Sequence, residues 1–341
     1  MRNLFLVVIS LLAVCSLQAR IFVCPFQNEE ERDGYSFTIV ELNCENLFDC
    51  LDDSLKQDEA FLPNGMYQWT YGKYWKKVNN IAREILACGE DSSGNISIPD
   101  IVALCEVEND TVIRDLTERS LLRNAKYESI VTHSPDERGI DVALLYSPFS
   151  FGFIESNAIR VVPLKNMRPT RDILYVKGRI ATGDTLNVFV VHAPSRSGGE
   201  YETRQNRLCV AKKLCESMDS LRQITPDSKI IIAGDFNDYS KDPSIRLIEQ
   251  HKLIDISGDA IGINNQAKGT YKYHGEWDSL DHIFVSESLD CNVVSCKIGD
   301  FPFLLCKDDD YGGVQPNRNF RGVKWQNGFS DHLPLILRIS F

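Results

Sequence analysis

Apolar runs of strand length alternate with helical patterns along most of the chain. Strands are expected at residues 35–43, 101–105, 140–148, 172–180, 184–195, 229–235, 280–286 and 330–340, with further candidates at 127–131 and 159–164. Helical spacing of apolar residues predicts helices at 71–89, 111–122, 200–218 and 243–251. Some strands follow one another directly, with Gly183-Asp184 as a turn, whereas others are separated by helices. This mixture favours two packed sheets flanked by helices over an all-parallel doubly wound sheet.

The first 20 residues have the pattern of an export signal. Arg2 supplies an early positive charge, and the apolar run from Leu4 to Val14 is too short to span a bilayer with ease. We therefore expect a signal peptide over residues 1–19 and a secreted or periplasmic protein. Acylation of Cys15, which would make a lipoprotein, is the less favoured alternative because bulky Val14 precedes it. No second long apolar stretch follows, so no integral membrane segment is expected after removal of the leader.

Composition restricts the class of protein. The chain has 341 residues, and no linker, repeat or low-complexity segment divides it, so we expect one domain over residues 26–341 and a monomer. Its formal net charge of −11 argues against a protein that coats nucleic acid nonspecifically, because that mode of binding needs a basic surface. A local basic groove in an enzyme is still compatible with this charge.

The cysteines suit an oxidising compartment. Eleven are present, and removal of Cys15 with the leader leaves an even ten. The cysteines most expected to be bridged are the Cys209/Cys215 pair and the later group of Cys291, Cys296 and Cys306, although spacing does not give their connectivity. No CxxC spacing occurs among them, which argues against a zinc site built from cysteines.

Polar residues recur at the ends of the apolar runs. They are Asn43, Glu106, His192, Asp235, Asn237, Asp281, Asp331 and His332. Each alone could be an ordinary turn residue, but a layered fold that gathers several strand ends at one edge would bring them together. Carboxylate and amide oxygens without thiolates favour Mg²⁺ or Mn²⁺, and a protonated histidine can stabilise charge on a phosphoryl oxygen. The set predicts metal-assisted hydrolysis of phosphate esters.

Seven motifs carry a family resemblance. ELNCENLFD, LCEVEN, GIDVALLY, VVHAPSRSGG, AGDFND, SLDHI and SDHLP stand in the order found in the endonuclease/exonuclease/phosphatase superfamily. The chain resembles its deoxyribonuclease-like branch over residues 35–341, and we expect a secreted bacterial member. The resemblance implies a four-layer α/β/β/α sandwich, with two packed mixed sheets flanked by helices.

The resemblance also implies a set of metal ligands. Glu106 would be the main ligand, helped by Asn43 and, through water, by Asp331. Glu108 competes for the same role or supports Glu106, since two residues along a strand it would share a face with it.

The same resemblance assigns the groups that act on the phosphate. Asp235 would orient and deprotonate the attacking water, and Asn237 would hold that water or a phosphoryl oxygen. His332 would hydrogen-bond the charge that develops on phosphorus oxygens, with Asp281 keeping its protonation state.

Three further roles follow from it. His192 matches the second histidine of the deoxyribonuclease-like branch, with Asp141 as its orienting partner. Arg171 stands where family members place a phosphate-contacting arginine, although Arg168 and Arg179 are close rivals.

Loops between such motifs choose the substrate, and two here combine aromatic with basic residues. Residues 61–75 and 311–329 could stack nucleobases, insert into lipid, stack on a sugar, or simply pack a small core under long loops. Because of the leader, a secreted nuclease or phosphodiesterase is the first expectation. A phospholipid or inositol phosphate hydrolase of the sphingomyelinase kind is the alternative. A catalytically idle binding module would predict broken motifs, and none of the seven is broken.

Overall fold

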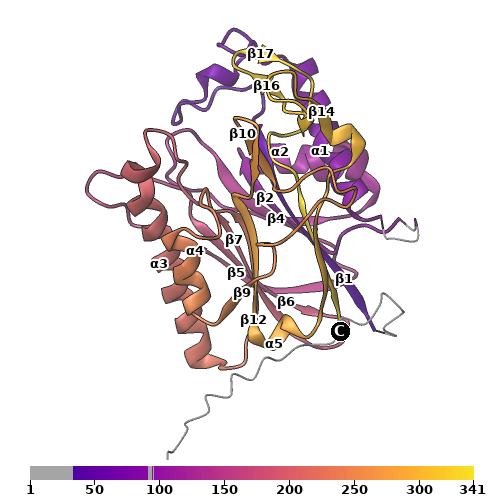
Figure 1. Cartoon of the computed structure of the whole chain (residues 1–341), viewed down its shortest axis with the longest axis vertical. Helices are drawn as coiled ribbons and strands as arrows, with labels where there is room; N and C mark the ends of the chain where they lie inside the picture. The colour runs from indigo at the N-terminus through magenta and orange to yellow at the C-terminus, as the bar shows by residue number, and fades with distance from the viewer. Residues whose placement is uncertain (1–33, 91–93, 95) are drawn as a thin grey trace, which may run out of the picture. The chain divides into compact units, whose positions relative to one another are not determined.

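Two six-stranded mixed sheets lie face to face in the computed structural model, which describes residues 34–90, 94 and 96–341 (Figure 1). The first has the order β13-β18-β1-β2-β4-β3, formed by Val293–Ile298, Leu335–Ser340, Ser36–Leu47, Ile101–Val107, Asp141–Tyr146 and Glu128–Val131. The second has the order β5-β6-β7-β8-β12-β9, formed by Phe151–Ile159, Ile173–Ile180, Thr185–His192, Lys229–Asp235, Asp281–Ser286 and Leu253–Asp255. Each sheet pairs two strands in parallel, β1 with β2 and β7 with β8, and its other pairs are antiparallel.

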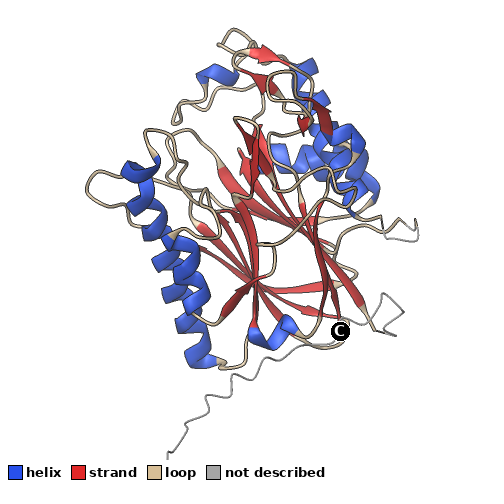
Figure 2. Ribbon diagram, in the orientation of Figure 1, coloured by secondary structure: helices blue, strands red, loops and turns tan. Residues whose placement is uncertain are grey.

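Helices cover the outer faces of both sheets (Figure 2). On the first sheet lie α1 (Tyr71–Cys88) and α2 (Asp110–Arg114), and on the second lie α3 (Glu200–Ile224) and α4 (Pro243–Gln250). Shorter segments are η1 (Glu59–Phe61), η2 (Asp115–Arg119), η3 (Leu121–Asn124), α5 (Glu287–Asp290) and η4 (Pro302–Leu304). The predicted four-layer sandwich is confirmed.

Alternation within the strands builds the layers. On β1, Ile39 points into the core between the sheets, and its neighbour Val40 points into the core under α1. The facing stripe of α1 carries Val78, Ile81 and Ile85, which are three and four residues apart and fully buried. Because the central strands β2, β4, β7, β8 and β12 are buried on both faces, their apolar runs are nearly continuous, which is the pattern that the sequence shows.

Three small hairpins lie at one end of the sandwich, at the top of Figure 1. They pair β10 (Tyr271–Tyr273) with β11 (Glu276–Asp278), β14 (Leu305–Lys307) with β15 (Val314–Pro316), and β16 (Phe320–Arg321) with β17 (Lys324–Trp325). The carboxyl ends of the parallel pairs β1/β2 and β7/β8 point toward this end, so the loops that follow those strands meet the hairpins.

Two strand predictions were wrong in their bounds. The strand expected at 159–164 is β5, which precedes that segment and ends at Ile159. β1 does not end near Asn43 but continues to Leu47 across an irregular pairing, with Glu45 at φ 45° and Asn46 at φ 58°. Propensity cannot foresee such left-handed residues inside a strand, because only neighbouring structure can stabilise them.

The prediction of disulfide bonding is wrong for Cys209, Cys215, Cys296 and Cys306. Cys209 and Cys215 both lie on α3 and are free thiols, and Cys296 and Cys306 are free as well. Six residues along a helix turn two side chains about 240° apart, so two cysteines at this spacing cannot approach each other. The leader and Cys15 lie outside the described residues.

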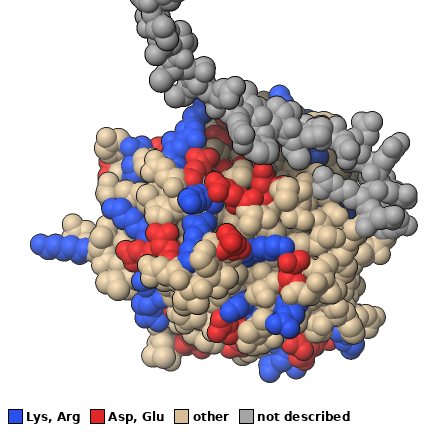
Figure 3. All heavy atoms as spheres, turned by 90° about the horizontal axis from the view of Figure 1, so that it is seen from below, with Lys and Arg blue, Asp and Glu red and all other residues tan. Residues whose placement is uncertain are grey.

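The described helices and surface exclude two features. None of these helices combines the length and the apolar character that crossing a bilayer requires. Figure 3 shows the end opposite β10 and β16, where Lys and Arg are mixed with Asp and Glu over the part that is visible. That face therefore offers no continuous basic track for a polyanion.

Candidate active site

Strand register places three predicted residues side by side. His192 ends β7 and pairs with Asp235 at the end of β8, and Asp281 at the start of β12 pairs with Asp235 from the other side. All three side chains are buried. The second sheet therefore supplies a rigid base on which a histidine and two carboxylates stand in one row.

His332 joins this row from the segment that leads into β18. Its Nδ1 lies 2.7 Å from Asp281 Oδ2, and the Thr270 hydroxyl donates to the same oxygen at 2.5 Å. Burial alone would lower the pKa of His332, but the Asp281 carboxylate outweighs burial and raises that pKa well above its ordinary value. The predicted pair is formed, and its histidine is held in the charged form.

Asp235 sits at the centre of a hydrogen-bond cluster. Its Oδ2 accepts from Asn43 Nδ2 at 3.0 Å and from Asn237 Nδ2 at 3.2 Å, and its Oδ1 accepts from the Asn237 backbone N–H at 2.8 Å. Burial, reinforced by the negative charge of Asp281, raises the pKa of Asp235 to about 7. A carboxylate with a pKa near neutrality is suited to accept a proton from water.

His192 lies beside two carboxylates without bonding closely to either. Its Nε2 is 3.7 Å from Asp235 Oδ2 and 3.8 Å from Glu106 Oε1. Burial and the nearby charge of Arg171 lower the pKa of His192 well below its ordinary value. The second histidine of the site is therefore neutral, in contrast to His332.

The predicted partnership of Asp141 with His192 is not formed. Asp141 Oδ1 accepts from the Thr132 hydroxyl at 2.6 Å and from the Ser134 backbone N–H at 3.0 Å. Nδ1 of His192 has no hydrogen-bond partner among the described residues. Asp141 starts β4 and ties down the segment before that strand, so its role here is to order backbone.

Arg171 is a structural residue and not an open phosphate contact. Its Nε donates to the His192 carbonyl at 3.2 Å, its Nη2 to the Ala193 carbonyl at 2.6 Å, and its Nη1 pairs with Asp136 at 3.2 Å. The side chain is buried and supports the end of β7. Arg138, which is exposed and donates through Nη2 to Asn46 Oδ1, is better placed to meet an incoming anion.

The predicted metal ligands have oxygens at the open edge of this cluster. Glu106 on β2 keeps 16% of its side chain exposed, and its Oε2 accepts from the Asn46 N–H at 2.8 Å. Asp331 keeps 21% exposed and is 2.5 Å from Arg318. Asn43 Oδ1 accepts from the Glu45 N–H at 2.9 Å, which leaves it one further lone pair. Partly exposed carboxylates fit Mg²⁺, which retains several waters when bound.

A second group of possible metal ligands lies deeper in the site. One atom each of Asp235, Asp281 and His332 lie within 4.8 Å of one another, which is close enough to hold a cation. These three side chains are buried, however, and each already has a hydrogen-bond partner. Asp281 is hydrogen-bonded to His332 and holds it as a cation. Asp235 accepts from Asn43 and Asn237. Glu106 and Asp331 keep part of their side chains exposed, so they could hold a metal ion whose coordination water completes.

Three residues that support the site carried no signal in the sequence. Thr270 donates to Asp281, and the Tyr271 ring centroid lies 4.9 Å from that of His332. Glu45, which is buried, accepts from the Asn319 and Phe320 N–H groups at 2.5 and 3.1 Å. Each comes from a short or irregular segment, so neither strand nor helix periodicity could mark it.

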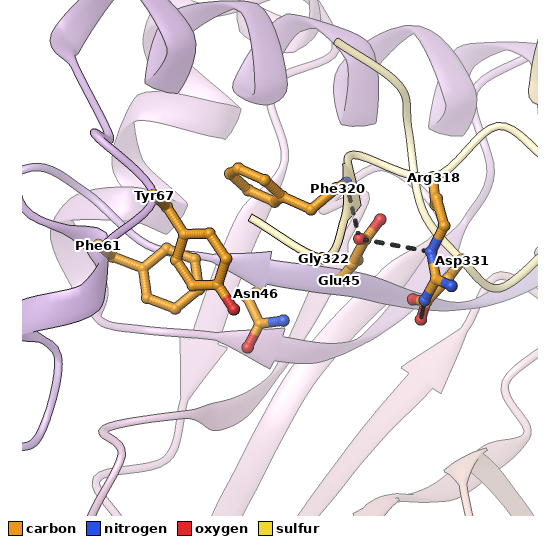
Figure 4. Close-up of a pocket in the computed structure, with 8 residues that line it drawn as sticks. All are labelled: Glu45, Asn46, Phe61, Tyr67, Arg318, Phe320, Gly322 and Asp331. Carbon is orange, nitrogen blue, oxygen red and sulfur yellow. Dashed lines mark hydrogen bonds and ion pairs between the residues drawn. The ribbon is translucent and has the colours of Figure 1, made fainter. Parts of the chain in front are cut away.

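The two aromatic loops mostly pack against each other. Trp69 is fully buried and its Nε1 donates to the Phe48 carbonyl at 2.9 Å, as the small-core interpretation predicts. Part of the aromatic surface stays open, because Phe61 and Tyr67 from one loop and Phe320 from the other line a hollow of about 220 Å³ beside Asp331 (Figure 4). The hollow lies next to the predicted metal ligand Glu106, since Asn46 lines the hollow and its backbone N–H donates to the Glu106 carboxylate.

Comparison with models of known protein families identifies the family of this chain. Residues 38–340 match the model of the endonuclease/exonuclease/phosphatase family. The chain belongs to that family. None of the curated proteins compared with it matches significantly.

Solved structures share the fold of this endonuclease/exonuclease/phosphatase family member at low identity. A family protein from Bacteroides thetaiotaomicron superposes with a TM-score of 0.60 at 18% identity, covering 90% of this chain and 98% of that one. The mannosyl-6-phosphatase Bt3783 of the same organism gives 0.59 at 19%, covering 89% and 100%. The human nocturnin catalytic domain with bound sulfate gives 0.54 at 18%, covering 90% and 94%.

Proposed function

We propose that this family member is a divalent-metal-dependent phosphoesterase. The observation that carries the proposal is the meeting of a charged histidine, His332 on Asp281, with Asp235, a carboxylate whose pKa is near neutrality, beside the open carboxylate edge of Glu106. An acid, a base and a hard-cation edge in one place are the parts that phosphate-ester hydrolysis needs.

Asp235 acts as the base in this proposal. Asn43 and Asn237 both donate to Oδ2 of its carboxylate, so the orientation of the acceptor is set before substrate arrives. Deprotonation of a water by this carboxylate supplies the nucleophile for in-line attack on phosphorus. As the new P–O bond forms, the ester P–O bond opposite it breaks, and the ester oxygen leaves and takes up a proton from water to give the alcohol. Asn237 is fixed by its contact with the Ala193 carbonyl at 3.1 Å.

His332 stabilises the charge that builds on the phosphoryl oxygens. Because Asp281 holds Nδ1, the other ring nitrogen is the one available to donate to substrate. His192 is neutral, so it can accept as well as donate and can orient water or a phosphoryl oxygen next to Asp235. The charged His332 thus stabilises negative charge on the phosphate, and the neutral His192 orients water or a phosphoryl oxygen.

Mg²⁺ or Mn²⁺ is the proposed cofactor, held by Glu106 with Asn43 and, through water, Asp331. When bound, such an ion would neutralise charge on the phosphate and orient it for attack. Arg318, which pairs with Asp331, adds positive charge to the same edge.

The proposed substrate is a nucleic acid or nucleotide ester, cleaved outside the cytoplasm by a monomer exported through the leader at 1–19. Partly open aromatic rings beside the metal edge support this choice, since they offer a surface on which bases stack. Neighbours of the same fold include nocturnin and a mannosyl-6-phosphatase, so other phosphate esters, among them lipid and inositol phosphates, are the alternatives to be tested.

The test is turnover of the purified mature chain against plasmid DNA, RNA, nucleotide esters, sphingomyelin and inositol phosphates, with Mg²⁺, with Mn²⁺ and with chelator. We expect metal-dependent cleavage of the nucleic acid or nucleotide class, and none by the Asp235→Asn variant. Metal-independent turnover, or equal activity of the variant, would overturn the proposal. Cleavage of the lipid or inositol class alone would overturn the choice of substrate but leave the chemistry standing.

A further inference from the structure

The hollow beside Asp331 has two unlike walls (Figure 4). One wall consists of the rings of Phe61, Tyr67 and Phe320, and the other of Arg318 and Asp331, with Glu45 behind them. At about 220 Å³ it is smaller than the pockets that enclose whole drug-sized ligands. It suits one ring-sized group joined to something bound next to it.

The aromatic wall is continuous and supported from behind. Tyr67 lies 4.8 Å from Phe61 and 4.6 Å from Phe320, measured between ring centroids. Phe61 in turn stacks on Phe48 at 4.3 Å with an interplanar angle of 8°, and Phe320 packs on the fully buried Trp69 at 5.6 Å. The rings are tilted against one another, by 35° between Phe61 and Tyr67 and by 46° between Tyr67 and Phe320, so a ligand can stack on one of them and meet the edges of the others. Because packing already holds these side chains, little further entropy is lost when a ligand binds.

Glu45 ties the two walls together. Its carboxylate accepts from the Asn319 and Phe320 N–H groups, which fixes the segment that carries the Phe320 ring. It also lies 4.0 Å from Arg318, whose guanidinium is 2.5 Å from Asp331. The polar wall is therefore as preorganised as the aromatic one.

The charges of the hollow indicate what it can hold. Arg318 is already paired with Asp331 at 2.5 Å and lies 4.0 Å from Glu45, so the charges of this wall are met within the protein. The group that fits is uncharged. It needs a flat face for the rings and a polar edge, with both donors and acceptors, for Arg318 and Asp331.

We infer that the hollow binds the nucleobase of a nucleotide whose phosphate lies at the Asp235 and His332 site. This inference rests on the proposed function and narrows it. An acyl chain lacks the polar edge, and the saturated ring of a sugar or an inositol lacks the flat π-face. Because the hollow takes one ring, the substrate is a mononucleotide ester or the end of a strand.

The test compares two ligands that differ only in the base. Thymidine 5′-monophosphate and 2-deoxyribose 5-phosphate are titrated by calorimetry, with Mg²⁺, into the mature Asp235→Asn chain so that neither is consumed. Stacking of one base on an aromatic side chain predicts roughly 5- to 150-fold tighter binding of the nucleotide. Glucose 6-phosphate is titrated in the same way as a sugar phosphate without a base. Equal binding of the first two ligands, or tighter binding of glucose 6-phosphate than of the nucleotide, would overturn the inference before any residue of the hollow is substituted.

Variants then locate the effect. Tyr67→Leu in the same background should bring the ratio of the two affinities close to one, whereas Tyr67→Phe should keep it. Tyr71→Leu is the matched control, since Tyr71 is 68% exposed and does not line the hollow. A ratio unchanged in Tyr67→Leu, or lost equally in Tyr71→Leu, would place the base elsewhere and refute the assignment.

The two proposals fail in different ways. If the wild-type chain hydrolyses no phosphate ester with either metal but binds thymidine monophosphate with the predicted ratio, the phosphoesterase proposal falls and the hollow stands as a base site. If it hydrolyses esters with no preference for a base, the inference about the hollow falls and the phosphoesterase proposal stands.

Discussion

The row of residues at the strand ends and the hollow beside it are built by different means. His192, Asp235 and Asp281 are placed by main-chain pairing of adjacent strands, so their spacing follows from sheet geometry. The hollow is placed by side chains from two segments more than 200 residues apart in sequence, with Phe320 packed on Tyr67 and held by Glu45. Sheet register can be the same in every member of a fold, whereas loop packing belongs to one sequence. We therefore expect this protein to share its catalytic chemistry with the family and to differ from other members in its substrate.

The largest effect should come from the strand-end row. Asp235→Asn and His332→Ala should each lower turnover by roughly a thousandfold or more, because a base or a charge stabiliser acts mainly in the transition state. Steady-state kinetics on the best substrate measures this loss. Asp235→Asn should leave the urea midpoint near that of the wild type, whereas His332→Ala should lower it, because the buried Asp281 carboxylate loses its charged partner. A variant that keeps wild-type turnover would remove its residue from the mechanism.

The core beneath the loops should matter for stability instead. Trp69→Ala should lower the free energy of unfolding by about 3–5 kcal/mol, since it empties a fully buried site and leaves the Phe48 carbonyl without its donor. Tyr71→Ala, two residues away but exposed, should change it by less than about 0.5 kcal/mol. Urea denaturation compares the two. Equal effects would show that the loops do not share a real core.

A buried ion pair links β12 to β9 and should make stability depend on pH. His282 Nδ1 is 2.9 Å from Asp255 Oδ2 and its Nε2 is 2.9 Å from the Asp238 carbonyl, so both ring nitrogens face acceptors. Burial opposes the charged ring, but Asp255 outweighs it and raises the pKa of His282, while the pKa of Asp255 is lowered although burial opposes that shift. His282 is therefore a structural residue.

The two shifted pKa values determine how the free energy of unfolding changes with pH. A raised histidine pKa stabilises the fold fully below the unfolded value of about 6.5, and the contribution is lost as pH rises through the folded pKa. The lowered Asp255 pKa contributes above about 3.9 and is lost as pH falls through its folded value. His282→Gln should cost about 1–3 kcal/mol at pH 6 and less at pH 9, measured by urea denaturation. A cost that does not change with pH would contradict a charged His282.

The smallest expected effect concerns the metal edge. Glu106→Gln keeps the size of the side chain but removes its charge, so the Mg²⁺ concentration for half-maximal turnover should rise about tenfold or more. Asp141→Asn is a suitable control, because Asp141 bonds only to Thr132 and Ser134 in the described structure. An unchanged Mg²⁺ requirement in Glu106→Gln would show that this carboxylate is not a ligand.

The strand ends were predictable, and their partners were only partly so. The sequence pattern placed Asn43, Asp235 and His332 at the tips of apolar runs, and the structure gathers them within hydrogen-bond reach of one another or of Asp281. It could not tell that Arg171 would turn inward to the carbonyls after β7. Whether an arginine faces solvent or backbone depends on acceptors from another segment, which local pattern does not contain.

By itself, the sequence determined the layered fold, its order of strands and helices, and the residue types available for chemistry, because burial on both faces and turn-forming residues are local properties. Only the tertiary structure decided that Asp141 would bond to Thr132 and not to His192, that Cys209 and Cys215 would stay apart, and that Glu45 would hold Phe320 against Tyr67. These pairings depend on register and on side-chain direction across segments distant in the chain. That information arises when the two sheets pack together.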